Sequence, residues 1–189
     1  MEFDPIGEAI DIFLKIKKRL NELENLLSSP NSVNEIRKKL RTRSREVPEM
    51  IIELGLVSTL SFCLAKAEMN NLSKIIRFIR YNEINILLRK QNQKIQLNTD
   101  TEKLAYAIYT YIILAYLEKY VKTLKKNKEA EITLNLEQLA SQTAETNNII
   151  YEYLNALLYK HNALFVSRLL QPYLLQFKRL CEAEFPSER

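Results

Sequence analysis

The sequence predicts an all-α fold, a compact bundle of about six to eight helices, because apolar residues recur at helical spacing along most of the chain. Glycine and proline are scarce, with 2 and 5 among 189 residues, whereas leucine, isoleucine, lysine and glutamate are abundant. This composition favours helices over turn-rich β structure. The hydrophobic fraction of 47% and the charged fraction of 27% are those of an ordinary globular protein.

The first helix is expected to begin at Asp4, a residue type that caps helices, with Pro5 at the first helical position. Its apolar residues keep helical spacing as far as Leu27. Residues 28–31 hold two serines, a proline and an asparagine, and we expect them to form a linker.

A second helix is expected to follow, opened by Ser32 and Glu35 as a capping-box pair. It runs toward Gly55, with a bend near Pro48. Because Gly55 is one of only two glycines, we expect it to end this helix in a left-handed conformation. A third helix then spans about residues 56–69.

Residues 71–97 are interpreted as one or two further helices. Thr99 and Glu102 form a second capping-box pair before a long helix over residues 103–124. That helix is apolar nearly all round, which predicts burial. Three more helical segments are expected at residues 136–143, 147–160 and 165–184. We expect one domain over residues 1–189, with a possible insertion or extension between residues 70 and 150.

The net charge of +5 is unevenly distributed. Residues 1–128 hold 23 Lys and Arg against 15 Asp and Glu, whereas residues 129–189 hold 5 against 8. A basic body with an acidic end indicates either a surface that faces a polyanion or a solvated surface that keeps the protein in solution.

Residues 33–54, placed on a helix, separate their apolar and basic side chains. The apolar arc contains Val33, Ile36, Leu40, Val47, Ile51 and Leu54. A separate basic stripe contains Arg37, Lys38, Arg41 and Arg45. The glutamates of the segment lie beside this stripe, so we expect them to leave it unneutralised and suited to a series of phosphates. Arg43 falls within the apolar arc, so it must reach outward or meet a buried partner.

Phe78 and Tyr81 alternate with Arg77 and Arg80, a pattern that can stack bases of single-stranded nucleic acid. Such aromatic residues more often belong to the core, and that interpretation is preferred here.

No constellation of catalytic residues is evident. The chain has one histidine, His161, in an expected turn, and three scattered aspartates. Two-metal chemistry needs converging carboxylates, and no Cys or His spacing suits zinc. The sequence therefore predicts no catalytic residue, no metal and no cofactor.

The compartment is expected to be the cytoplasm. Cys63 and Cys181 do not make a disulfide scaffold, and Cys63 is expected to pack as a small hydrophobic residue. The N-terminal residues lack the pattern of a signal peptide. The longest uncharged run, residues 104–117, is shorter than the roughly 20 residues of a membrane span.

Residues 134–166 offer a competing interpretation, a winged helix-turn-helix with a short strand at residues 164–166. Its recognition helix at residues 147–160 would carry only one lysine and one glutamate, where DNA binding needs basic groups for the backbone. Helical packing is therefore preferred there. A DNA-binding regulator and a helical scaffold without nucleic-acid contact both remain open alternatives.

Residues 43–66 carry a more specific pattern, in which a basic helix leads through a proline, an apolar segment and a glycine to a second apolar segment ending in lysine. This segment resembles the signature of the small-subunit family of type III-B CRISPR effector complexes, the RNA-guided Cmr complexes. The matching residues are Val47, Pro48, Ile51, Ile52, Gly55, Leu56, Leu60, Phe62 and Lys66. A weaker match lies at residues 173–185.

The resemblance implies a non-catalytic, all-helical subunit whose copies stack in the inner filament of the complex, beside other Cmr subunits. Basic surfaces would contact the backbones of guide and target RNA, while base pairing reads the sequence. Binding of the isolated chain to RNA should then be weak, independent of sequence and steeply dependent on salt. From the matched segment and the helix faces together, the expected RNA-contacting residues are Lys17, Lys18, Lys38, Arg41, Arg43, Arg45 and Lys66.

Overall fold

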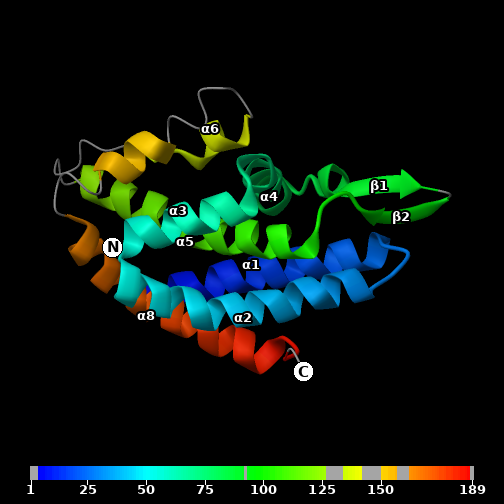
Figure 1. Cartoon of the computed structure of the whole chain (residues 1–189), viewed down its shortest axis with the longest axis horizontal. Helices are drawn as coiled ribbons and strands as arrows, with labels where there is room; N and C mark the ends of the chain where they lie inside the picture. Colours follow the sequence, from blue (N-terminus) through cyan, green and yellow to red (C-terminus); the bar gives the residue numbers. More distant parts are fainter. Residues whose placement is uncertain (1–3, 92, 127–133, 142–149, 157–161, 188–189) are drawn as a thin grey trace.

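The structure is a computed structural model that describes residues 4–91, 93–126, 134–141, 150–156 and 162–187. It confirms the predicted helical bundle (Figure 1). In chain order the elements are α1 (Pro5–Leu26), α2 (Asn31–Leu54), α3 (Leu56–Ala67), α4 (Met69–Tyr81), the 3-10 helix η1 (Ile84–Leu87), β1 (Leu88–Gln91), β2 (Lys94–Leu97), α5 (Thr101–Lys126), α6 (Leu136–Ala140) and α8 (Asn162–Glu184). Residues 150–156 are also helical.

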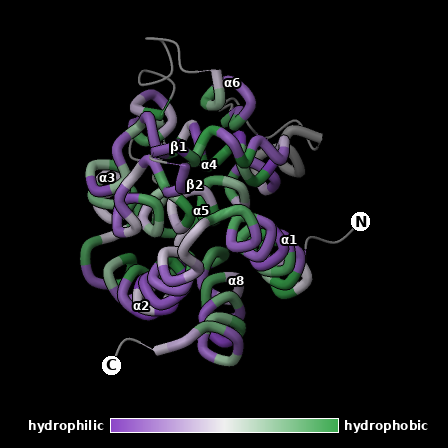
Figure 2. Tube along the Cα trace, turned by 90° about the vertical axis from the view of Figure 1, so that its right-hand side faces the viewer, coloured by the Kyte–Doolittle hydropathy of each residue, from purple (hydrophilic) through white to green (hydrophobic). Residues whose placement is uncertain are grey.

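Helix α5 forms the centre of the bundle. Helices α2, α3 and α4 all contact α5. Helix α8 packs against α1 and α2 (Figure 1). Every side chain from Leu104 to Leu114 is buried, as the apolar sequence of this segment predicts. The surrounding helices alternate hydrophobic and hydrophilic residues along their length, as amphipathic helices do (Figure 2). Among the described helices, none combines the length and the apolar content that a bilayer crossing requires.

The predicted helix starts are confirmed in one case and wrong in two. Asp4 accepts a hydrogen bond from the amide of Ile6 at 3.0 Å, and Pro5 begins α1 as expected. Helix α2 starts earlier than predicted, because Pro30 already has helical backbone angles and its carbonyl accepts the first bond of the helix. No side chain caps α2, so the expected capping box there is wrong.

Helix α5 is capped by Asp100, one residue after the expected Thr99. The amide of Glu102 donates to Asp100 Oδ1 at 2.7 Å. A carboxylate at this position satisfies free amides of the first turn and interacts favourably with the helix dipole.

Gly55 separates α2 from α3. Its φ of 84° is positive, as expected, but its ψ of 160° lies outside the left-handed helical region. The amide of Gly55 closes α2 on the carbonyl of Ile51, and its own carbonyl accepts from Thr59 in α3. A side chain at this position would meet no atom within 4 Å, so backbone conformation alone accounts for the glycine. Pro48 is accommodated inside α2, which continues to Leu54.

Residues 84–91 and 93–97 form a 3-10 turn and two strands and contain no α-helix, which corrects the prediction for residues 71–97. Helix α4 ends at Tyr81 because Asn82 adopts a left-handed conformation, which stops the helix. Strands β1 and β2 then pair antiparallel, with Leu88 opposite Leu97 and Gln91 opposite Lys94. This hairpin projects from the helical body (Figure 1).

The winged-helix interpretation is also wrong in its strand. Leu164, Phe165 and Val166 lie in the first turns of α8, so the expected wing is helical. Residues 136–140, 150–156 and 162–166 are helical, as the preferred interpretation expected. His161 lies outside the described residues.

Aromatic residues join α1, α5 and α8. The ring of Phe177 meets Phe13 edge-on at a centroid distance of 5.8 Å and Tyr109 at 6.0 Å. Phe177 and Tyr109 are 0% exposed, and Phe13 is 2% exposed. Burial of three large rings in one contact makes this cluster a main source of the hydrophobic stabilisation between these helices.

Replacement of Phe177 by alanine should therefore lower the free energy of unfolding by about 3–5 kcal/mol, because the cavity adds to the lost burial. Urea denaturation followed by circular dichroism measures this change. Leu175→Ala on the same helix is the matched control, since Leu175 is 48% exposed and should cost less than about 1 kcal/mol. Equal losses in the two variants would contradict the packing of Phe177 between Phe13 and Tyr109.

Candidate nucleic-acid interface

The seven predicted RNA-contacting residues lie on three helices and do not form one continuous surface. Lys17 and Lys18 are on α1, and Lys66 is in the last turn of α3. The other four are on α2, namely Lys38, Arg41, Arg43 and Arg45. Their neighbours divide them into three environments.

Three of the seven surround the last turn of α8. Lys17 pairs with Glu184 at 2.7 Å, and Arg45 pairs with Glu182 at 2.7 Å. Arg41 donates to the backbone carbonyl of Phe185 at 2.6 Å. Unpaired carbonyls and the negative end of the helix dipole attract cations to such a position.

The expectation that acidic residues leave the basic stripe unneutralised is therefore wrong. The acids that pair with Lys17 and Arg45 belong to α8, more than a hundred residues away in the chain. A helical projection of residues 33–54 alone cannot contain them. Arg37, at the start of the stripe, is likewise held by Asn21 and Glu24 of α1.

Arg43 meets partners inside the bundle, which is one of the two outcomes expected from its place in the apolar arc. It pairs with Glu46 on its own helix and with Glu102 on α5, and its guanidinium lies 4.4 Å from the ring centre of Tyr106. Burial acts to lower the pKa of Arg43, but the hydrogen bond to Glu102 and the nearby negative charges raise it overall. The side chain joins α2 to α5, and only 15% of it is exposed.

The remaining three are closer to free cations. Lys38 pairs with Glu35 on the same helix at 3.0 Å, an exposed contact of small energy. Lys66 lies over the ring of Phe62 at 5.7 Å, and Lys18 is exposed. Within the described part of the chain, neither Lys18 nor Lys66 has a carboxylate partner.

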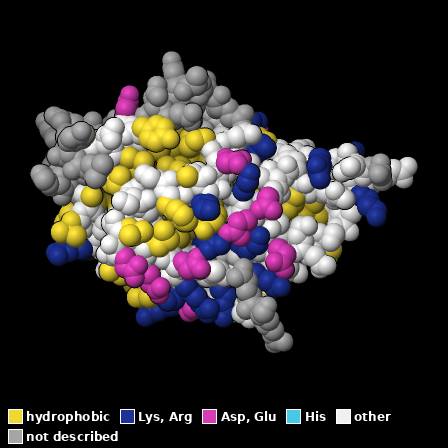
Figure 3. Space-filling view, in the orientation of Figure 1, with side chains coloured by type: hydrophobic (Ala, Val, Ile, Leu, Met, Phe, Trp, Pro, Cys, Tyr) yellow, Lys and Arg dark blue, Asp and Glu magenta, His cyan; other side chains and the backbone are white. Residues whose placement is uncertain are grey.

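Charges of both signs mix over the body of the molecule. Figure 3 shows lysines and arginines next to aspartates and glutamates over α2 and α8. This face therefore presents alternating charge to a ligand, with no uniform positive field.

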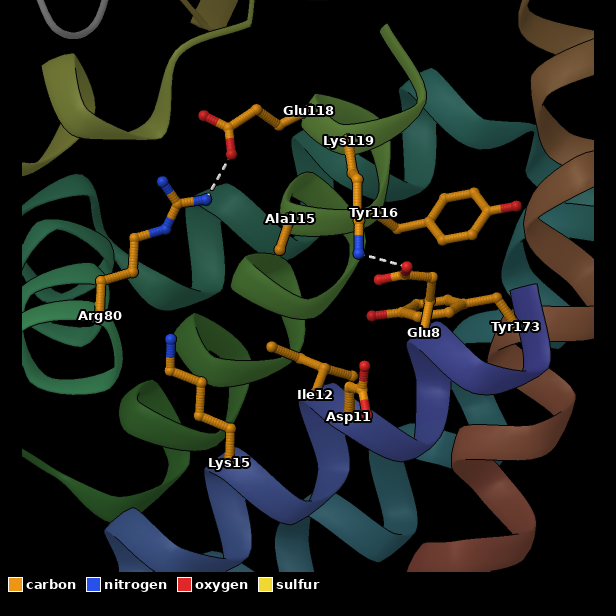
Figure 4. A pocket seen from close by; sticks show the side chains of 10 residues that line it. All are labelled: Glu8, Asp11, Ile12, Lys15, Arg80, Ala115, Tyr116, Glu118, Lys119 and Tyr173. Atoms are coloured by element: carbon orange, nitrogen blue, oxygen red, sulfur yellow. Dashed lines mark hydrogen bonds and ion pairs between the residues drawn. The ribbon is translucent and has the colours of Figure 1, made fainter. Parts of the chain in front are cut away.

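A polar pocket of about 390 Å³ lies between α1, α4, α5 and α8 (Figure 4). Its walls carry three acids and three cations, Glu8, Asp11, Glu118, Lys15, Arg80 and Lys119. Lys119 pairs with Glu8, and Arg80 pairs with Glu118. Burial, together with the charges of Arg80 and Arg19, lowers the pKa of Lys15. Because the charges balance, the pocket does not select for a polyanion.

The two aromatic residues considered for base stacking differ in position. Phe78 is 1% exposed and belongs to the core, as preferred, whereas Tyr81 is 48% exposed. The neighbouring arginines Arg77 and Arg80 pair with Glu83 and Glu118. No stacking platform combines both rings.

Groups able to bind a metal do not converge in the part of the chain that the structure describes. Cys63 and Cys181 are both buried and unpaired, so Cys63 packs in the core as predicted. Burial raises the pKa of the Cys63 thiol to about 12, which leaves it protonated at neutral pH.

Glu102 provides a test of the α2–α5 contact. Burial acts to raise its pKa, but the hydrogen bonds from Lys39 and Arg43 lower it overall. The ionised carboxylate is thus favoured by folding, and this contribution is present above the unfolded pKa and disappears as pH falls through the folded value. Glu102→Gln should be less stable than wild type at neutral pH, by less than about 1 kcal/mol because the carboxylate is partly exposed.

Urea denaturation at neutral pH and in acid measures this difference, which should shrink as the pH falls below the ordinary glutamate value of 4.5. Glu49→Gln, at an exposed position of α2, is the control for loss of a carboxylate charge on the surface. A Glu102→Gln penalty that is the same at both pH values would show that ionisation is irrelevant to the contact.

Comparison with known proteins assigns the chain to a family. In solved structures, a chain of the type III-B Cmr-beta complex bound to non-cognate target RNA matches with a TM-score of 0.64 and 21% identity over 100% of both chains. A chain of the Cmr-beta complex bound to cognate target RNA and AMPPnP matches with a TM-score of 0.62 and 20% identity over 97% of both chains. A comparison with curated protein sequences finds no match.

The sequence profile of the CRISPR-associated protein family Cas_Cmr5 matches residues 15–163, most of the chain. That range contains the segment at residues 43–66 whose pattern suggested the resemblance. The chain therefore belongs to the Cas_Cmr5 family of CRISPR-associated proteins.

Proposed function

We propose that this chain is the non-catalytic small subunit of a type III-B RNA-guided, RNA-targeting complex, in which it contacts other Cmr subunits, guide RNA and target RNA. The observation that carries the proposal is the family match over residues 15–163. Support comes from the end-to-end fold similarity to chains of Cmr-beta complexes bound to target RNA. We also propose a cytoplasmic location, because the complex acts on RNA.

Contact with the RNA backbone is the first part of this function. Lys18 and Lys66 offer charges that no described carboxylate neutralises, so a phosphate can bind them without first displacing a glutamate. Lys17, Arg41 and Arg45 would have to release the end of α8 first. Backbone contacts of this kind carry no sequence information, which fits a complex whose specificity comes from base pairing.

Stacking beside neighbouring subunits is the second part. An apolar groove of about 480 Å³ lies between α2 and α8 and is lined by Pro48, Ile52, Pro172 and Leu175. Ile52 is 68% exposed and Leu175 is 48% exposed. Adjacent exposed apolar side chains favour a protein neighbour, and we assign the filament contact to this groove. We also infer a single domain, since helices from both ends of the chain share one core.

Co-purification tests the assembly. A tagged chain expressed together with the other subunits and a guide RNA should recover those subunits and a short RNA. Recovery of a DNA operator fragment would favour a transcriptional regulator. Recovery of protein subunits without RNA would leave a helical scaffold, and recovery of neither would contradict the proposal.

Filter binding of the isolated chain tests the direct RNA contact. Lys18→Gln combined with Lys66→Gln should weaken binding to single-stranded RNA and reduce the slope of log affinity against log salt by about 1.4, since each lost phosphate contact removes about 0.7. Lys17→Gln combined with Arg45→Gln has the same net charge and should lose less, because those two cations are already paired with glutamates of α8. Equal losses would indicate that only net charge matters.

A further inference from the structure

The β1–β2 hairpin carries charge of one sign only. Residues 88–97 contain Arg89, Lys90 and Lys94 and no aspartate or glutamate. All three cations are exposed. Within the described residues, none of them forms an ion pair. The projecting end at the right of Figure 3 accordingly shows lysine and arginine with no acidic side chain beside them.

The register of the hairpin sorts its side chains onto two faces. One face holds Leu88, Ile95 and Leu97, which pack against the core, together with Lys90. The opposite face is polar throughout, and all four of its residues are exposed, namely Arg89, Gln91, Lys94 and Gln96. We call these four residues the polar hairpin face.

The connection between α1 and α2 holds the hairpin in place. The amide of Ser28 donates to the carbonyl of Ile95 at 3.0 Å, and the amide of Ile95 donates to Ser28 Oγ at 2.9 Å. Asn98 adds bonds from its amide to Leu87 and from its side chain to Ile86. Because β2 is bonded to the connection between α1 and α2 and the apolar face packs against the core, the direction of the polar face is determined before any ligand binds.

The two cations of the polar hairpin face suit successive groups of one strand. Arg89 lies opposite Gln96, and Lys94 lies opposite Gln91, so the two cations are diagonal neighbours. Diagonal neighbours in an antiparallel pair are about 7–8 Å apart, so two long side chains can hold adjacent phosphates. The amides of Gln91 and Gln96 can donate to phosphate oxygens and both donate to and accept from ribose hydroxyls.

A protein partner fits this face less well. Stable protein interfaces have an apolar or aromatic centre, and the polar hairpin face has neither. Its cations also differ from Lys17, Arg43 and Arg45 of the helical body, which are held by glutamates. Cations that are free of internal partners bind an external anion without that competition.

We propose that the polar hairpin face binds the ribose-phosphate backbone of RNA, as a contact separate from the basic helices α1–α3. The inference rests on the proposed function in that it assumes an RNA-containing complex. The hairpin lies in the region between residues 70 and 150, where an insertion or extension was expected. The proposal gives this region a role in RNA binding.

Fluorescence anisotropy with a labelled single-stranded RNA of mixed sequence tests the contact on the isolated full chain. Arg89→Gln combined with Lys94→Gln should reduce affinity about tenfold at low salt and lower the salt slope by about 1.4. The control, Arg168→Gln combined with Arg179→Gln, removes the same charge from exposed positions of α8 and should lose less than about threefold. Equal losses in the two variants, or no loss in the hairpin variant, would overturn the proposal.

A crosslink identifies the partner in the reconstituted complex. Gln91→Cys, labelled with a benzophenone maleimide, should transfer to RNA, while Ser58→Cys on α3 is the exposed control. The native cysteines are buried and should not react. Transfer from position 91 to a protein subunit, or no more transfer to RNA than from position 58, would overturn the assignment.

The two readouts separate failure of this inference from failure of the proposed function. A wild-type chain that does not enter the complex contradicts the proposed function, and the anisotropy series still decides the hairpin. Where the isolated wild-type chain binds RNA too weakly to measure, the crosslink in the complex decides instead.

Discussion

The burial of residues 104–114 of α5 on all sides is the constraint on which the rest of the structure depends. A helix that is apolar nearly all round must be surrounded, and α2, α3 and α4 each bring one apolar face to it. Helix α8 then reaches this core through hydrogen bonds from Tyr173 to the carbonyl of Ile112 and from Tyr116 to the carbonyl of Leu169. These bonds satisfy buried polar groups and align α8 along α1 and α2.

The same arrangement decides what the charged residues can do. The packing of α2 against α5 directs Arg43 toward Glu102 and Tyr106. The guanidinium of Arg43 therefore holds these two helices together. Packing α8 against α1 and α2 brings Glu182 and Glu184 to Arg45 and Lys17. Among the described residues, Lys18, Lys66 and the three cations of the hairpin keep no carboxylate partner.

Local patterns predicted much of the fold because their causes are local. Asp4 and Pro5 begin α1 as expected, Gly55 interrupts α2 and α3 at a positive φ, and the apolar run of α5 is buried. The hairpin was missed because residues 84–97 mix apolar and polar side chains too briefly to distinguish the helical period from the strand period. Asparagine readily adopts the left-handed conformation that ends a helix, so Asn82 at the end of α4 was the signal available in the sequence.

By itself, the sequence determined the helical class, the burial of α5, the separation of apolar and basic arcs on α2, and the resemblance of residues 43–66 to the Cmr small-subunit family. These properties follow from spacing along one helix, which a single chain segment contains. Only the tertiary structure decided which cations are neutralised, because the acids that pair with Lys17 and Arg45 come from the far end of the chain. It also decided that a basic hairpin projects from the bundle, since strand pairing and its anchoring at Ser28 join segments that no local pattern connects.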